Sequence, residues 1–138
     1  MQLNGDNAVI ELNILGQSSP NSREGWDRKW LTVSIKVTLN GFYANFQTEL
    51  LSDDFIAFIQ SLQKALNTLN GEVELTSLED TLYLKGVINY KGNVEWSGFL
   101  VYPAGNGNKL TFKFESDFYQ FERIKNELVA DLKTYKIM

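Results

Sequence analysis

Residues 25–39 have the sequence Gly25-Trp26-Asp27-Arg28-Lys29-Trp30-Leu31-Thr32-Val33-Ser34-Ile35-Lys36-Val37-Thr38-Leu39. The stretch begins as a polar loop that holds two of the three tryptophans, and from Leu31 onward it alternates between apolar and polar residues. Successive side chains of a strand point to opposite faces of a sheet, so this pattern predicts a strand with one dry face. We expect the rest of the chain to be organised around this strand.

The neighbouring segments predict further antiparallel strands. Asn40-Gly41 follows Leu39 directly, and this dipeptide favours a two-residue type I′ turn, in which both central residues have positive φ. Residues 42–51 are therefore expected to pair with residues 31–39. The same alternation, interrupted by turn residues, predicts strands over residues 8–15, 72–76, 81–88, 93–102 and 109–115.

Two segments have helical periodicity. Ser52 is a candidate N-cap for a helix whose apolar residues recur at three- and four-residue steps as far as Leu69. Asp117 and Gln120 form a capping-box pattern before a second such helix, which ends near Tyr135. Together the segments predict one α+β domain over residues 1–138, with a mainly antiparallel sheet of about six to seven strands and two helices packed on one face.

The amino-acid composition excludes several classes of function. The 138 residues include 13 basic and 17 acidic ones, a net charge of -4, so the attraction to phosphate that drives nucleic-acid binding is missing overall. Cysteine and histidine are both absent, which excludes disulfides, zinc-thiolate sites and histidine-based catalysis. The first residues do not resemble a signal peptide, and no apolar run reaches the length of about eighteen residues of a membrane span. We expect a cytoplasmic protein that binds neither nucleic acid nor membranes.

Carboxylates are the remaining candidates for acid–base chemistry. Asp53 and Asp54 fit the first turn of a helix, where negative charge is favourable, and the glutamates fall on the polar sides of strands. A catalytic carboxylate pair would require two such groups to converge in one cleft. The glycine-rich residues 105–108 do not lead into a helix, so they predict a hairpin loop and not a phosphate site. We therefore expect no catalytic residues, no metal and no cofactor.

Two groups of residues are candidates for binding a partner. Trp26, Asp27 and Trp30 lie where the loop enters the central strand, and the Asp27 carboxylate would either anchor the loop through local hydrogen bonds or contact a partner. Tyr83 and Phe99 belong to a set of apolar residues on the nominally wet side of their strands, with Val87 and Val101. That strip is either an interface or is covered by the N-terminal segment or by residues 17–25.

The order of elements and the motif Asp27-Arg28-Lys29-Trp30-Leu31 resemble the WapI-type immunity family of bacterial polymorphic-toxin systems. The resemblance covers about residues 8–135, and Lys29 stands where the family tends to have asparagine. It implies a non-catalytic cytoplasmic protein that binds a cognate toxin domain, commonly a basic nuclease, and blocks it. The alternative from a different class is a homodimeric ligand-binding domain that uses the Tyr83 and Phe99 strip as its interface and has a small apolar pocket between helices and sheet.

Overall fold

The chain folds as two successive units of four strands followed by a helix. The computed structural model describes residues 1–138. The first unit comprises β1 (Gln2–Gly5), β2 (Ala8–Gln17), β3 (Trp30–Leu39), β4 (Phe42–Leu51) and α1 (Ser52–Thr68), with a 3-10 turn, η1 (Asp27–Lys29), before β3. The second comprises β5 (Glu72–Thr76), β6 (Leu82–Ile88), β7 (Asn93–Tyr102), β8 (Asn108–Asp117) and α2 (Gln120–Thr134).

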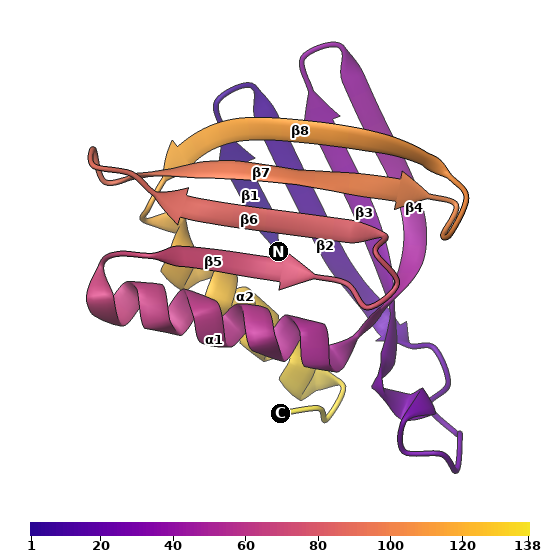
Figure 1. The fold of residues 1–138 in the computed structure, drawn as a ribbon. Helices are drawn as coiled ribbons and strands as arrows, with labels where there is room; N and C mark the ends of the chain where they lie inside the picture. The colour runs from indigo at the N-terminus through magenta and orange to yellow at the C-terminus, as the bar shows by residue number, and fades with distance from the viewer.

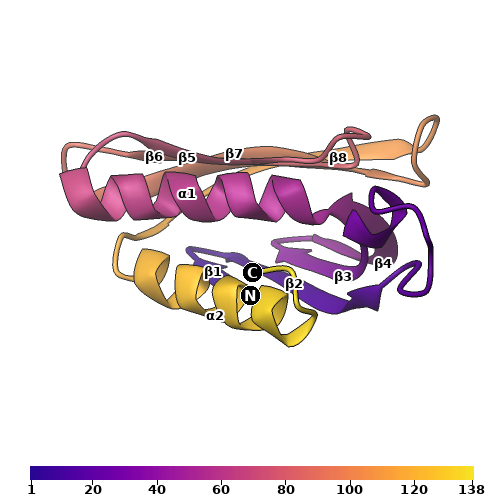
Figure 2. The same ribbon diagram turned by 90° about the horizontal axis from the view of Figure 1, so that it is seen from below.

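Each unit forms its own antiparallel sheet. The first sheet has the order β1-β2-β3-β4 and the second the order β5-β6-β7-β8. In Figure 1 the second sheet lies in front and its strands cross those of the first sheet behind it. Figure 2 shows the two sheets as separate layers, with α1 beside the second sheet and α2 beside the first. The two helices contact each other along one side of this sandwich.

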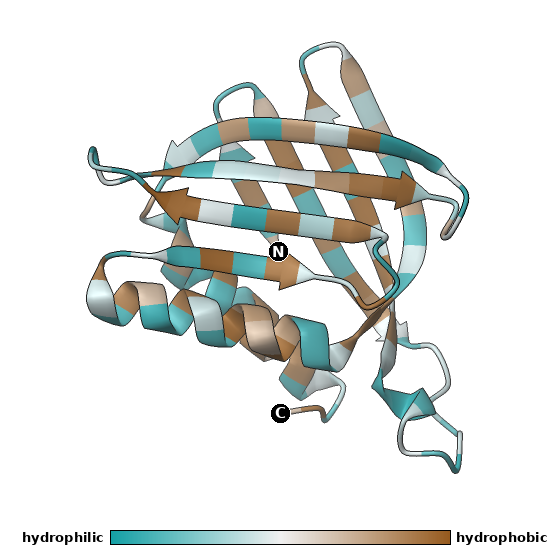
Figure 3. Cartoon of the chain, in the orientation of Figure 1, coloured by the Kyte–Doolittle hydropathy of each residue, from teal (hydrophilic) through white to brown (hydrophobic).

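The core fills the space between the two sheets. It consists of the alternate apolar residues of both inner faces together with the apolar stripe of each helix, and Figure 3 shows this alternation along the strands. Trp96 of β7 is the largest fully buried side chain, and its indole Nε1 donates a hydrogen bond to Ser116 Oγ at 2.8 Å. The central strand has Leu31, Val33 and Ile35 fully buried, as its alternation predicts.

The α+β class and the antiparallel pairing are confirmed, but the arrangement of strands differs from the expected single sheet of six or seven. There are eight strands in two sheets of four. The additional strand is β1, a short segment that pairs with β2. The helices do not cover the face of one sheet, because each inner face is covered by the opposite sheet and the helices close one side instead.

Three local predictions were wrong in detail. Leu51 and not Ser52 is the N-cap of α1, and Tyr119 precedes α2 in place of the expected capping box; neither cap forms a side-chain hydrogen bond. In the turn between β3 and β4 only Gly41 has positive φ, at 81°, so the turn is not type I′. The pairing of Leu39 with Phe42 is nevertheless the predicted one.

Candidate functional site

The loop before β3 brings Trp26 and Asp27 to the surface. Trp26 is 52 % exposed, and the Lys29 ammonium lies 5.6 Å from the centre of its ring. The Asp27 carboxylate accepts a hydrogen bond from Ser22 Oγ at 3.2 Å, so it does hold the loop locally, although through a hydroxyl and not through backbone N–H groups. Both side chains also remain accessible to a partner.

Trp30 lies in a different setting from the other two loop residues. It is half-buried at the start of β3, directly opposite Leu51 of β4, and its carbonyl accepts a hydrogen bond from the Ser18 backbone N–H at 2.9 Å. Trp30 therefore contributes to the junction of loop and sheet, whereas Trp26 and Asp27 face outward.

Tyr83 and Phe99 are brought together on the outer face of the second sheet. They are directly opposed across β6 and β7, and their rings stack with centroids 5.6 Å apart. The Lys109 ammonium lies over the Phe99 ring, 4.1 Å from the ring centroid. Val87 is 38 % exposed on the same face. Neither the N-terminal segment nor residues 17–25 cover this strip, since the former is β1 and the latter connect β2 to β3 in the other sheet.

Acidic groups surround the Tyr83 ring. The Tyr83 hydroxyl donates to Glu74 Oε2 at 3.4 Å, and partial burial, with Glu74 adding to it, raises the pKa of Tyr83. Lys85 forms an ion pair with Glu72 at 2.9 Å, and the hydrogen bond in this pair raises the pKa of Lys85. The outer face thus combines an aromatic pair with charges of both signs. No hydrogen bond, ion pair or ring contact joins this strip to Trp26 or Asp27.

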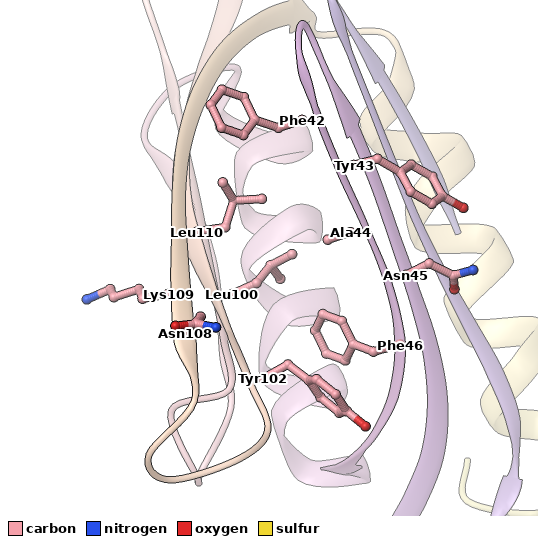
Figure 4. A pocket seen from close by; sticks show the side chains of 10 residues that line it. All are labelled: Phe42, Tyr43, Ala44, Asn45, Phe46, Leu100, Tyr102, Asn108, Lys109 and Leu110. Carbon is pink, nitrogen blue, oxygen red and sulfur yellow. The ribbon is translucent and has the colours of Figure 1, made fainter.

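A groove that the sequence did not indicate lies between the two sheets, on the side away from the helices. Its volume is about 350 Å³, and it is lined by residues of β4, β7 and β8. Figure 4 shows Phe42 and Phe46 of β4 facing Leu110 of β8, while Tyr43 and Asn45 point away. Phe46 stacks on Tyr102, with ring centroids 4.7 Å apart. The hollow between the start of α1, the residues after α2 and the first sheet is lined mostly by polar residues, among them Gln17, Asp53 and Lys136. The apolar groove therefore lies between strands and not between helices and sheet.

The carboxylates at the start of α1 have structural roles. Asp53 forms an ion pair with Lys29 at 3.3 Å. Asp54 Oδ2 accepts a hydrogen bond from the Leu78 backbone N–H at 3.1 Å, which fixes the turn between β5 and β6. Burial raises the pKa of Asp54 above its ordinary value of 3.8, against the opposing effect of that hydrogen bond. No three acidic side chains are grouped so as to hold a metal ion.

The structure thus has two accessible aromatic surfaces and one apolar groove as candidate sites for a partner. The model of the immunity protein WapI-like family matches residues 1–136. The chain belongs to the WapI-like immunity protein family. The match covers both four-strand units and both helices. A comparison with curated proteins gives no match. Neither helix of this WapI-like protein is long and apolar enough to cross a membrane.

Proposed function

We propose that this WapI-like protein is an immunity protein that neutralises a cognate toxin domain by binding it directly, without catalysis. The observation that carries the proposal is the family match over residues 1–136. On this proposal the protein acts as one domain in the cytoplasm and requires no cofactor. The toxin domain is the partner, and the activity of this chain is to inhibit that domain.

The surface features support a protein partner. Aromatic residues are enriched where proteins bind each other, and here Trp26, Tyr83 and Phe99 are accessible on two separate surfaces. We propose that these residues, with Asp27 and Trp30, contact the toxin domain. The net charge of -4 favours a basic toxin domain such as a nuclease, because opposite charges speed association.

A second candidate function is a homodimeric small-ligand-binding or interaction domain. The groove of about 350 Å³ favours it, since that volume lies within the range of small-molecule pockets, roughly 300–1,000 Å³. The groove is open to the surface between two strands, which suits a partner segment better than an enclosed small molecule.

Co-expression tests the proposal. The chain is expressed together with the C-terminal domain of any large secreted protein encoded beside its gene, and growth and co-purification are measured. Rescue of growth with a stable complex is the expected result. Toxicity without rescue would contradict the immunity function and favour the ligand-binding candidate.

The candidate contact residues are tested in the same assay. Alanine substitutions of Trp26 and Phe99 are expected to weaken rescue while the variants remain folded. A matched control is Tyr90→Ala, because Tyr90 is 93 % exposed in the turn between β6 and β7. Equal loss in the control would show a general surface effect and would contradict the assignment of Trp26 and Phe99.

A further inference from the structure

We propose that the toxin domain is bound by addition of one of its extended segments to the free edge of β4, with alternate side chains of that segment entering the apolar groove. This inference rests on the proposed function and adds the binding site and the kind of segment bound. Three features support it: the unpaired edge of β4, the groove beside that edge and the charged residues around both.

The edges of β5 and β1 are occupied within the chain, and the edge of β8 is occupied at one end. The edge of β5 is covered by α1. The edge of β1 is hydrogen-bonded to α2. The Gln120 side chain bonds both the N–H and the C=O of Asn4, and Arg123 Nη2 donates to the Gln2 carbonyl at 2.7 Å. At one end of β8 the Asp6 backbone N–H donates to the Glu115 carbonyl at 2.8 Å. The rest of that strand contains Lys109 and Lys113, and lysine commonly protects a free edge from pairing. The edge of β4 has no such partner.

The backbone of β4 therefore presents unpaired groups in a regular series. Leu39 and Phe42 flank a two-residue turn, so they exchange both backbone hydrogen bonds, and the pairing then alternates along the strand. By that alternation the backbone N–H and C=O groups of Tyr43, Asn45 and Gln47 point to the free edge. β4 is ten residues long and contains no lysine or proline, and its one charged residue, Glu49, lies near its end. Lysine, other charged residues and proline commonly protect a free edge from pairing.

The groove beside this edge accepts apolar side chains. Phe42 is 62 % exposed and Tyr102 is 51 % exposed, although Phe42 lies on the inner face of its sheet. A fifth strand beside β4 would direct every second side chain onto Phe42, Phe46 and Leu110, and the other side chains would lie beside Tyr43 and Asn45. The segment bound is therefore extended, with apolar and polar residues in alternation.

The charges around the groove indicate the charge of the segment that it binds. β4 is uncharged from Phe42 to Thr48. Along β8 the charged residues between Asn108 and Phe114 are Lys109 and Lys113, and neither is in an ion pair within the chain. A second hollow continues the groove along β8 and is lined by both Lys113 and Asp6, whereas Lys109 points away from the groove (Figure 4). The uncharged groove thus favours a neutral segment, even in a toxin domain that is basic elsewhere.

The experiment uses the full chain and the C-terminal toxin domain that the co-expression test identifies, from any large secreted protein encoded beside its gene. Amide hydrogen exchange is measured with and without that domain, and the amides of Tyr43, Asn45 and Gln47 are expected to become protected. Asn45→Pro removes one N–H on the free edge while leaving the bonds to β3 intact, and we expect it to weaken binding at least about tenfold. Phe42→Glu, which adds a charge to the apolar groove, is expected to weaken binding, whereas Gln60→Glu at an exposed position of α1 adds the same charge without effect.

A second pair of variants covers the case in which proline prevents folding. The chain has no cysteine, so Asn45→Cys and Asn13→Cys can each be labelled with a bulky maleimide. Both asparagines are exposed on the first sheet, but Asn13 lies on β2, away from the free edge. The label at residue 45 should block binding, and the label at residue 13 should not.

The possible results separate this inference from the proposed function. If the unmodified chain binds the domain but the β4 amides stay unprotected and Asn45→Pro binds equally well, the edge is not the site and the immunity function stands. If the unmodified chain does not bind the domain at all, both are overturned. If the free chain is a dimer with protected β4 amides, a second copy occupies the edge, which overturns the toxin segment as the occupant.

Discussion

The side chain of Gln120 pairs with both backbone groups of Asn4, which is 116 residues earlier in the chain. Its Nε2 donates to the Asn4 carbonyl at 2.6 Å, and its Oε1 accepts from the Asn4 N–H at 2.9 Å. The amide thus takes the place of a neighbouring strand and satisfies the edge of β1. Through this pair the first strand of the fold is fastened to the last helix.

Replacement of Gln120 should therefore destabilise the protein even though the side chain is not in the core. Gln120→Ala removes three hydrogen bonds, two with Asn4 and one that Arg123 Nη2 donates to Gln120 Oε1 at 3.0 Å. Each has a net value of about 1 kcal/mol, so the free energy of unfolding should fall by about 1–3 kcal/mol. Urea denaturation measures this change. Gln60→Ala, at an exposed position of α1, is the control and should have almost no effect. Equal stability of both variants would contradict the role of the pair.

Gly86 is expected to tolerate no side chain. A Cβ at this position would lie 2.8 Å from Cζ3 of Trp96, which is fully buried. Gly86→Ala should lower the free energy of unfolding by about 1–3 kcal/mol, because the indole has little room to move. At Gly25 the nearest atom to an added Cβ is the end of Arg28, 3.7 Å away. Thermal unfolding of Gly25→Ala should thus match the unsubstituted protein, and a similar loss at both glycines would argue against a packing effect.

Substitutions of Asp27 and Trp30 should show whether each residue stabilises the fold or contacts a partner. Asp27 is exposed and has a single side-chain hydrogen bond, so Asp27→Asn should change the free energy of unfolding by less than about 0.5 kcal/mol. Trp30 is half-buried against the sheet, and Trp30→Ala should cost about 2–3 kcal/mol. Denaturation and toxin rescue are measured for both variants. Loss of rescue by a fully stable Asp27→Asn would assign Asp27 to partner contact, whereas unfolding of that variant would assign it to the fold.

Asp54 should make stability depend on pH in the acidic range. Burial raises its pKa above 3.8 in the folded protein, so the folded state favours the protonated form. The favourable contribution is complete below pH 3.8 and is lost as the pH rises through the folded pKa. Asp54→Asn keeps an acceptor for the Leu78 N–H and carries no charge. Its melting temperature should exceed that of the unsubstituted protein at pH 7 and equal it at pH 3; a difference that is the same at both pH values would contradict this account.

Local patterns were sufficient to predict much of the first sheet and both helices. The alternation of residues 31–39 and the turn at Asn40-Gly41 correctly predict β3 and its pairing with β4. The apolar stripes predict α1 and α2, whose buried residues follow the expected spacing. In these elements the residues that determine the structure lie within a few positions of each other, so the sequence carries the information directly.

The remaining features depend on contacts between distant segments. β1 is only four residues long, and its edge is stabilised by Gln120 and Arg123 of α2, which no local pattern reveals. The division into two sheets follows from the absence of pairing between β4 and β5, which α1 separates in the chain. The groove could not be predicted either, because it depends on which strand lies at a free edge.

The three tryptophans are distributed so that the native protein carries its own optical probes. Trp96 is fully buried, whereas Trp26 is about half exposed in the loop. Emission from Trp96 should be shifted to the blue and should report unfolding of the core, while emission from Trp26 is open to aqueous quenchers. Iodide quenching with and without a toxin domain would therefore show whether the loop becomes shielded, with no label attached to either protein.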